Sequence, residues 1–599
     1  MYKVIQQHHI LVIPAIFLLA ILQAMMPILL IYFTKTTIDF LSIPKQDVPA
    51  IIRFVVQVII LIWISRIVIN ALEKWIAMYA NRNRHSLLQM IENKVLTMDY
   101  FNLESPEVQR ARRKAIQAIN SNLSGGEAIF ANSGLLLQHA IDLVCYSIFI
   151  SSLSIFIFLA LLLSYSFITM LTRYAQLFES NNKKEESKIE QRLGYVREHL
   201  IKYESAKDIR LFSMSNWFTK YMYDNTELVL RFKKKILTKF YHVELISDML
   251  SFLRDGIAYA FLIKQVLSGV LTVGEFSFYL ACIAGLSNWL GLISKDITLI
   301  HKSSIEIGYL RNFLDIPDRT GVQNAKSRLL NRNTPPEIVF ENVSFRYPNS
   351  SDLTIRDLNL VIQPGEKLSI VGLNGAGKST FVKLLCGFYP PTAGRILVDS
   401  VDVTSFSKED YYRLFSAVFQ ENRILAFDVQ QNIALCPKDQ IDHARMRTAI
   451  SRAGLSITID SLEEGVYTPL TRKFEQNGVI LSGGQLQKLL LARALYKDSP
   501  IVVMDEPTAA MDPLAEAELY NQFSKLVEGK TSIFISHRLA STRFCDRIIL
   551  LKDGHIEEDG CHDDLMKLNG EYARLFNIQA KNYRENLEGV FQCENIAKQ

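Results

Sequence analysis

The strongest chemical signal in the sequence is a glycine-rich run that ends in a lysine and two hydroxyl residues. It reads Gly372-Leu-Asn-Gly-Ala-Gly-Lys-Ser-Thr380 and follows the apolar stretch 368–371. Glycines at this spacing let backbone N–H groups curve around phosphate oxygens, and a helix that begins there adds its positive dipole end. We expect Lys378 to neutralise the β- and γ-phosphates and Ser379 to ligate Mg²⁺. The loop residues expected to contact the nucleotide are Gly372, Asn374, Gly375, Ala376, Gly377, Lys378, Ser379 and Thr380.

Two adjacent carboxylates close an apolar run further along the chain. The run Ile501-Val-Val-Met-Asp-Glu506 has the composition of a buried strand with both acids at its end. Acidic strand ends are common in α/β proteins, but beside a phosphate loop they indicate nucleotide hydrolysis. Asp505 would then hold the metal through water, and Glu506 would polarise the attacking water as a catalytic residue.

A third motif, Leu481-Ser-Gly-Gly-Gln485, lies between the phosphate loop and the acidic strand. Ser482 is a helix cap, and the glycines leave space for a phosphate at the helix N-terminus. Taken alone this is an ordinary cap. In this order along the chain it resembles the signature of ATP-binding cassette (ABC) proteins.

The resemblance assigns roles to four further residues. Tyr347 would stack on adenine, and Gln420 would reach the metal and sense the γ-phosphate. His537 would contact the γ-phosphate as a second catalytic residue, and Asp512 would belong to a contact loop between cassettes. The implied cofactors are ATP and Mg²⁺.

A dimer also follows from the resemblance. In that family the signature of one cassette completes the ATP site of another, so Ser482, Gly484 and Gln485 would act on a second chain. One cassette per chain therefore implies two copies, or this chain with a related half-transporter. The ATP-site motifs are intact, which favours two equivalent sites in a homodimer.

Two departures from the family's usual pattern point to a lineage. The contact loop reads Ala509-Ala-Met-Asp512, and the segment 471–478 differs from the Gly-Glu-Arg-Gly of multidrug exporters. This segment and 512–516 are more similar to those of bacterial lantibiotic and peptide exporters.

The first half of the chain is apolar enough to cross a membrane repeatedly. Hydrophobic residues make up 49% of the 599 residues and charged residues 21%, which excludes a disordered chain. The seven cysteines form no CxxC pair and are expected to be ordinary reduced thiols. A span needs ~20 mainly apolar residues. The six expected transmembrane helices cover residues 10–33, 52–72, 134–152, 154–172, 246–267 and 276–293.

Basic residues set the expected orientation. The segments after the second and fourth spans are long and basic, with Arg112-Arg113-Lys114 and Lys233-Lys234-Lys235 as examples. Because basic flanks stay cytoplasmic, both termini should lie inside a multi-pass protein of a bacterial cell membrane. We interpret these charges as solvated faces of helices that prolong the spans, and we expect no nucleic-acid partner.

The expected fold is therefore a polytopic α-helical domain, 1–317, followed by a linker, 318–336, and a cytoplasmic α/β P-loop ATPase domain, 337–578. A C-terminal tail covers 579–599. We expect no peptidase domain before the first span, which begins near residue 10, and no extracellular domain, because the outer connections are short.

Two aromatic elbows lie near the midpoints of the basic segments, at 99–106 and 205–213. They are either buried elbows or docking surfaces for the cassette. We expect the pairs Tyr100-Phe101 and Leu211-Phe212 to dock, because exposed apolar side chains are unfavourable without a partner.

The function implied is ATP-driven export of a peptide or amphipathic substrate by alternating access. The alternatives are a multidrug or lipid exporter, an importer on the exporter fold, a channel or regulator on the same scaffold, and a membrane-anchored ATPase machine. Polar residues within the spans are costly in lipid, so we expect four of them to face a cavity or, for Arg254 and Asp255, water at the cytoplasmic part of the fifth span. They are His139, Asp142, Arg254 and Asp255.

The acidic strand end gives the first prediction. Glu506→Gln should bind ATP but hydrolyse it at least ~10²-fold slower, a loss of ~2.7 kcal/mol in transition-state stabilisation, because the amide cannot polarise water. Steady-state ATP hydrolysis and nucleotide binding by the purified variant measure both quantities. Near-normal turnover would remove Glu506 from the mechanism. As the contrasting variant, Lys378→Ala should lose affinity for ATP itself.

Overall fold

The computed structural model describes residues 11–42, 48–121, 125–202, 205–318, 334–348, 350–419, 423–505, 527–536 and 539–580. Contacts divide the chain into two compact units, Met1–Leu96 with Gln109–Ile316, and Thr97–Val108 with Pro317–Gln599. Most of the expected linker and tail lie outside the described residues. The second unit thus includes a short segment from between the expected second and third spans.

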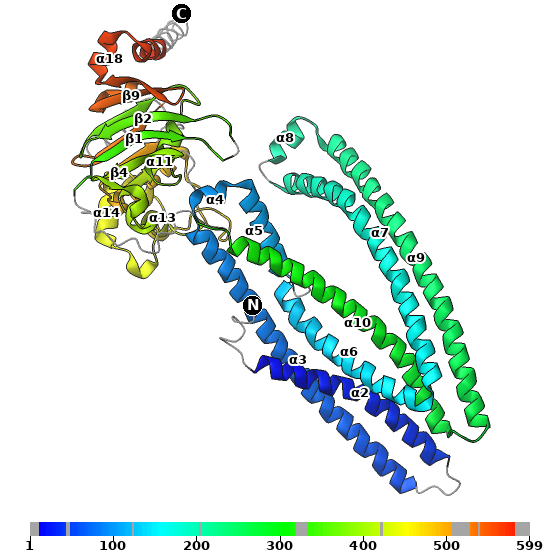
Figure 1. The fold of residues 1–599 in the computed structure, drawn as a ribbon. Coiled ribbons are helices and arrows are strands. Elements are labelled where there is room, and N and C mark those ends of the chain that lie inside the picture. Colours follow the sequence, from blue (N-terminus) through cyan, green and yellow to red (C-terminus); the bar gives the residue numbers. More distant parts are fainter. Residues whose placement is uncertain are drawn as a thin grey trace, which may run out of the picture. The chain divides into compact units, whose positions relative to one another are not determined.

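The first unit consists of long helices (Figure 1). They are α2 (Val12–Leu41), α3 (Val48–Thr97), α5 (Pro106–Ile119), α6 (Gly125–Leu153), α7 (Ile155–Ile201), α8 (Ala206–Leu211), α9 (Ser215–Leu267) and α10 (Val273–Leu314). Only Ser154, in an extended conformation, separates α6 from α7. Helix α7 is 47 residues long and α9 is 53, so the basic segments continue the apolar ones without a break.

Five described helices are long and apolar enough to cross a membrane: α2, α3, α6, the stretch Ile155–Lys183 of α7, and α10. The expected span at 246–267 lies within α9, where Asp248, Arg254 and Asp255 interrupt the apolar run. Six spans therefore stays a prediction. Arg254 and Asp255 form an ion pair with each other at 2.8 Å, so each offsets the charge of the other.

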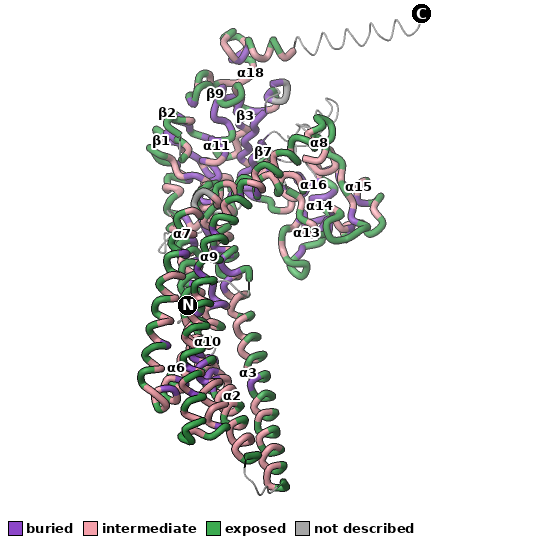
Figure 2. Tube along the Cα trace, turned by 90° about the vertical axis from the view of Figure 1, so that its right-hand side faces the viewer, coloured by how far each residue is buried: buried purple, intermediate pink, exposed green. Residues whose placement is uncertain are grey.

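Helices α6 and α10 pack together through the largest buried side chains of the unit. Tyr146 and Ile150 of α6 lie against Ile283 and Leu286 of α10. Gly285 makes this approach possible, since a Cβ placed there would lie 2.4 Å from Cε1 of Tyr146. The core of this unit is therefore narrow, and Figure 2 shows most of its helical surface as exposed or half-buried.

The second unit contains two sheets. An antiparallel sheet has the order β2-β1-β4-β5, and a larger sheet has the order β10-β9-β3-β8-β7-β6. The strands of the first are β1 (Ile338–Phe345), β2 (Ile355–Ile362), β4 (Ala393–Val398) and β5 (Val401–Asp402); those of the second are β3 (Lys367–Val371), β6 (Phe415–Val418), β7 (Ile501–Asp505), β8 (Thr531–Ile535), β9 (Arg547–Lys552) and β10 (His555–Gly560). Short apolar, β-branched runs such as β7 and β8 are buried throughout, as strands covered on both faces require.

The helices of this unit fill the intervals between strands. They are α4 (Tyr100–Glu104), α11 (Lys378–Leu385), α12 (Lys408–Tyr412), α13 (Val429–Ala434), α14 (His443–Arg452), α15 (Ser456–Asp460), α16 (Gly483–Lys497) and α18 (His562–Leu568), with short 3₁₀ turns at η2 (Val403–Ser405), η3 (Lys438–Gln440), η4 (Gly465–Tyr467) and η5 (Leu539–Phe544). A last helical stretch covers 571–580.

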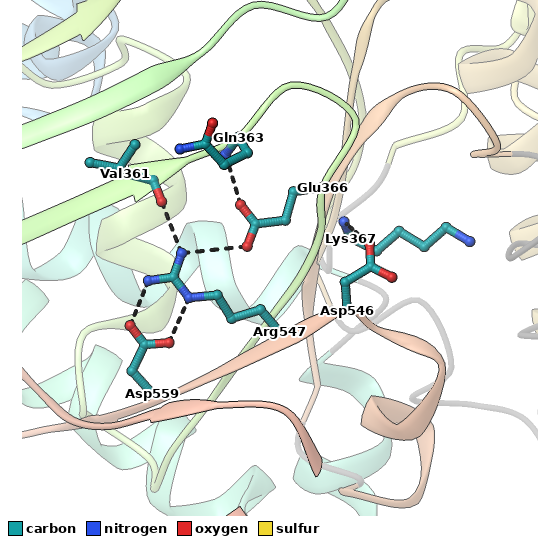
Figure 3. A network of polar contacts seen from close by, with 7 residues as sticks. All are labelled: Val361, Gln363, Glu366, Lys367, Asp546, Arg547 and Asp559. Atoms are coloured by element: carbon teal, nitrogen blue, oxygen red, sulfur yellow. Dashed lines mark hydrogen bonds and ion pairs between the residues drawn. The ribbon is translucent and has the colours of Figure 1, made fainter. Parts of the chain in front are cut away.

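A guanidinium joins the two sheets (Figure 3). Arg547 of β9 donates to both oxygens of Asp559 on β10, at 2.6 and 2.5 Å, and to the carbonyl of Val361 on β2 at 3.0 Å. Glu366, before β3, accepts a further bond at 3.4 Å. None of the residues in this network is a predicted site residue, and we assign it a structural role.

The first elbow docks on the cassette, whereas the second is exposed in this structure. Tyr100 stacks on Phe388 with ring centroids 4.8 Å apart, and Phe101 packs against Tyr389 at 6.3 Å. Asp99, which is 4% exposed, pairs with Lys408 at 2.5 Å. The docking expectation is therefore met at 99–106. Leu211 and Phe212 are 77% and 69% exposed, so docking of this second pair stays a prediction.

Gly285 provides a test of the α6–α10 packing. Gly285→Ala should lower the free energy of unfolding by ~1–3 kcal/mol, because the new methyl group overlaps Tyr146, a 2% exposed ring that has no room to move. Thermal unfolding in detergent measures the change. Gly291→Ala is the matched control on the same helix, since nothing lies within 4 Å of its added Cβ. Its better helix propensity should leave the midpoint unchanged or slightly higher. Equal midpoints for the two variants would contradict the packing described.

Candidate nucleotide site

The parallel order of the larger sheet brings the predicted site residues to one edge. Strand β8 pairs in parallel with β3 on one side and with β7 on the other, and β7 pairs in parallel with β6. The carboxyl ends of parallel strands meet at the same edge of a sheet, where ligands bind in open α/β folds. The phosphate loop follows β3, and Asp505 ends β7 directly opposite Ile535 of β8.

The phosphate loop has a backbone that only glycine supports without strain. Gly372, Gly375 and Gly377 have φ values of 154°, 83° and 106°. A Cβ on Gly372 would lie 2.3 Å from the carbonyl oxygen of Leu551. Gly377 is the N-cap of α11, so the helix begins at Lys378 as the sequence predicts. A glycine-rich loop of this kind, followed directly by a helix N-terminus, is the arrangement that phosphate binding by backbone amides requires.

Lys378 is buried at the head of α11. Its side chain is 6% exposed and its Nζ donates to the carbonyls of Gly372 and Leu373 at 2.9 and 3.0 Å. Burial lowers the pKa of this ammonium, and the charge of Asp505 opposes the shift. The lysine ammonium is thus held by two neutral carbonyl acceptors of its own loop. A bound phosphate would replace them with charged oxygens, which are stronger acceptors.

Asp505 is the matching acid. It is 8% exposed at the end of β7, and burial raises its pKa while Lys378 opposes the rise. A buried carboxylate gains from a divalent cation, because the cation offsets the desolvation of the charge. Asp505 and the hydroxyl of Ser379, the second residue of α11, fit a magnesium site of oxygen ligands.

Tyr347 lies beside the same helix. Its hydroxyl is 3.0 Å from Oγ1 of Thr380, and its ring contacts Phe345 and Tyr389 edge to face at 5.0 and 5.4 Å. The structure therefore places this aromatic next to the phosphate loop. Stacking on adenine stays a prediction.

The signature begins a helix whose N-terminus is open to solvent. Ser482 caps α16 in a capping box: its Oγ accepts from the backbone N–H of Gln485 at 3.4 Å, and its own N–H donates to Oε1 of Gln485 at 2.9 Å. Ser482 and Gly483 are exposed and Gly484 is half-buried. Leu489 and Leu491 anchor the helix in a separate core with α13 and α14. The capping prediction is confirmed, and Gln485 has a structural role that the motif alone does not reveal.

Four predicted functional residues lie outside the described residues: Gln420, Glu506, Asp512 and His537. Their described neighbours Phe419, Asp505 and Ser536 stand at or just after the carboxyl ends of β6, β7 and β8. The roles of these four residues stay predictions.

The first elbow reaches the helix that follows the phosphate loop. Lys383 of α11 donates to Glu104 at 3.0 Å, and the hydroxyl of Tyr389 also donates to Glu104. Although burial opposes ionisation, the hydrogen bonds from Tyr389, Lys383 and Tyr100 hold the pKa of the Glu104 carboxyl below its ordinary value. The sequence analysis found the aromatic pair but missed Glu104, since an isolated acid in a basic segment carries no motif.

The sequence analysis also missed the last helical stretch, 571–580. The hydroxyl of Tyr572, a fully buried residue, lies 2.9 Å from Oγ1 of Thr542 and 2.8 Å from Nδ1 of His562. Gln579, assigned above to the tail, accepts from the N–H of Leu539 at 2.9 Å. Tyr572 and Leu539 share a buried cluster with Val371, the residue before the phosphate loop. This stretch therefore packs against both the strand end before the phosphate loop and the segment that follows His537. The helical spacing of Tyr572, Leu575 and Phe576 could have predicted it from the sequence.

One family model matches part of the chain. The ABC transporter family model matches residues 355–509, which include the phosphate loop, the signature and the acidic strand. This region is an ABC transporter domain.

Several curated proteins are similar in sequence. The subtilin transport ATP-binding protein of Bacillus subtilis is 29% identical over 397 residues, which cover 66% of this chain and 63% of that protein. The nisin transport ATP-binding protein of Lactococcus lactis is 31% identical, covering 64% of each. The ATP-dependent lipid A-core flippase of Bordetella pertussis is 32% identical over 54% of this chain and 51% of its own length. The matched region therefore spans less than two thirds of each relative.

A solved structure has the same fold. It is described as a bacterial Atm1-family ABC exporter with ATP bound, and the match has a TM-score of 0.77 with 21% sequence identity. It covers 97% of this chain and 99% of the other. The fold of this chain, helical unit and cassette together, is thus similar to that of the exporter structure.

Tyr572 tests the support of the site by the C-terminal stretch. Tyr572→Phe should destabilise the cassette by ~1–2 kcal/mol, because Thr542 and His562 lose their common buried partner. We also expect ATP turnover to fall about 3- to 10-fold with little change in ATP affinity, since Leu539 is two residues from His537. Thermal unfolding and hydrolysis kinetics measure these effects. Tyr467→Phe, at a 57% exposed ring, is the control. Equal turnover in both variants would mean that the stretch only stabilises the fold.

Proposed function

We propose that this chain is an ATP-driven ABC exporter that moves a peptide or amphipathic substrate across a bacterial cell membrane. The observation that carries the proposal is that Lys378 and Asp505 lie at one sheet edge, close enough to influence each other's charge, in a chain whose described part has five helices apolar enough to span a bilayer. A phosphate loop without such helices would favour a soluble ATPase. Fused to them, it supports a transporter.

Each ATP would be bound by the phosphate loop, with Mg²⁺ held by Ser379, Gln420 and Asp505. Glu506 would polarise water and His537 would contact the γ-phosphate. Lys378 would exchange its two loop carbonyls for phosphate oxygens. When bound, the metal ion supplies charge neutralisation for the transferred phosphoryl group.

We propose that a second copy of the chain completes each site. At the start of α16, Ser482 and Gly483 are exposed, so a partner could approach the helix N-terminus there. A helix N-terminus binds anions because its first amides lack intrahelical acceptors. Closure of two cassettes around ATP, followed by hydrolysis and opening, would drive alternating access. Both termini would lie in the cytoplasm.

A peptide substrate is favoured over a lipid by the pre-signature segment and by the transporters named for subtilin and nisin. A lipid is the second candidate, because relatives named as lipid A-core flippases match almost equally well. An importing direction on the same fold is the third.

Transport assays on the purified chain in liposomes separate these candidates. ATP added outside the liposomes reaches only the molecules whose cassettes face the outer medium. It should drive accumulation of a fluorescent cationic amphipathic peptide inside the vesicles, and Glu506→Gln should abolish this accumulation. Accumulation of a labelled glycolipid in the opposite leaflet, without peptide uptake, would favour the lipid. ATP-dependent loss of substrate already inside would indicate import.

Glu104 tests coupling between the two units. Glu104→Gln should lower substrate moved per ATP by about 2- to 5-fold, since it weakens a partly exposed contact worth roughly 0.5–1 kcal/mol. ATP hydrolysis should change less, because the site residues are untouched. The lowered pKa means that the contact is intact near neutral pH and is lost as the pH falls through that pKa, so wild-type coupling should approach the variant's on acidification. Glu463→Gln, at an exposed cassette position, is the control. An unchanged ratio would place coupling elsewhere.

A further inference from the structure

Four polar side chains lie inside the otherwise apolar contact between α6 and α10. His139 and Asp142 belong to α6, and Trp289 and Asp296 belong to α10. Asp142 is 0% exposed, His139 is 6% and Asp296 is 3%. None of them takes part in the proposed ATP chemistry, and all lie in helices apolar enough to cross a membrane.

Asp142 has no partner that could offset a negative charge. Its polar neighbour Gln138, one turn earlier on the same helix, can offer at most the hydrogen bond of a neutral amide. By distance and angle, neither carboxyl oxygen has a hydrogen-bond partner in the described part of the chain. A buried ionised carboxylate without a counter-charge is disfavoured by several kcal/mol.

The base nearest to Asp142 along α6 is His139, which is already paired with another carboxylate. Nδ1 of His139 lies 2.7 Å from Oδ2 of Asp296, so any positive charge on that ring is offset by a different carboxylate. Trp289 stacks on His139 at 5.4 Å and meets the ring of Tyr146 at 6.1 Å. Asp142 lies between His139 and Tyr146 on α6. The indole of Trp289, which contacts both of these rings, therefore covers the part of the helix that carries Asp142.

The other elements packed against this stretch bring no cation to it within the described residues. On α6 and α10 the remaining titratable neighbours are Cys145, Tyr146 and Cys282. On α7 the hydroxyl of Tyr165 donates to the carbonyl of Leu290. The buried residues in the corresponding part of α2 are Ala20 and Ala24. The Nε1 donor of Trp289 is itself buried without an acceptor.

We propose that Asp142 is a proton-binding site within the membrane-spanning helices. The carboxyl group holds a proton while α6 and α10 are packed as in this structure, and loses it to water when the contact opens. Packing of α6 on α10 is therefore favoured at low pH and weakens as the pH rises. This goes beyond the proposed export and would hold whatever the cargo is.

Infrared spectroscopy of the full-length protein in lipid nanodiscs tests the proposal directly. The wild type should show the C=O band of a neutral carboxylic acid at neutral pH, and Asp142→Asn should lose it. Asp296→Asn is the matched control, and it should keep the band, because Asp296 is paired with His139. If Asp142→Asn does not fold, Asp142→Glu keeps the acid and should shift the band.

Stability gives an independent readout. As the pH rises, the thermal midpoint of the wild type should fall relative to that of Asp142→Asn. At high pH the wild type must either lose the α6–α10 packing or bury a charged carboxylate, whereas the neutral amide of the variant does neither. Absence of the neutral-acid band at neutral pH, or a band that Asp142→Asn leaves unchanged, would overturn the proposal. Loss of the band on adding Na⁺ at constant pH would also overturn it, because the site would then take a metal cation.

Discussion

The parallel order of β3, β8, β7 and β6 is the constraint on which the nucleotide site depends. It requires each strand to end at the same edge, so residues separated by more than a hundred positions, such as Lys378 and Asp505, interact electrostatically. This arrangement has two costs in free energy. One is a loop backbone that only glycine adopts without strain, and the other is the burial of two charged groups, whose pKa values burial shifts in opposite directions. Both costs are offset when a phosphate and a metal ion occupy the edge.

The helical unit follows a different constraint. Its core is thin, and α6 and α10 approach closely only where Gly285 admits the ring of Tyr146. A close contact of this kind has little room to deform gradually, so polar groups inside it must be either paired or neutral. His139 with Asp296 is the paired case, and Asp142 is the neutral one. The α6–α10 contact is thus the part of the unit whose packing depends on protonation.

The features that could be predicted from the sequence are those that depend on a pattern of residues close together along the chain. The phosphate loop, the capping box at Ser482 and the break between α6 and α7 are all encoded within a few residues. Prediction failed where the information is tertiary. The aromatic pair at 100–101 was expected to dock, but nothing in the sequence indicates that Glu104 binds Lys383 and Tyr389. Nothing near Tyr572 indicates that its hydroxyl joins Thr542 to His562. Likewise, the polarity of Asp142 was visible in the sequence, but its lack of a partner is a property of the fold.

A series of side-chain contacts connects the first elbow to the helix that follows the phosphate loop. Glu104 binds Lys383 and Tyr389; the ring of Tyr389 lies against Tyr347, whose hydroxyl meets Thr380 of the phosphate-loop helix. Every link joins side chains that are in direct contact, and α11 carries both Lys383 and Lys378 on eight residues of rigid helix. These contacts are the path by which a change at the elbow would act on the phosphate loop, and by linkage the free energy of that coupling would be the same in the reverse direction. Because the elbow lies between α3 and α5 along the chain, we propose that this path links nucleotide chemistry to the helical unit.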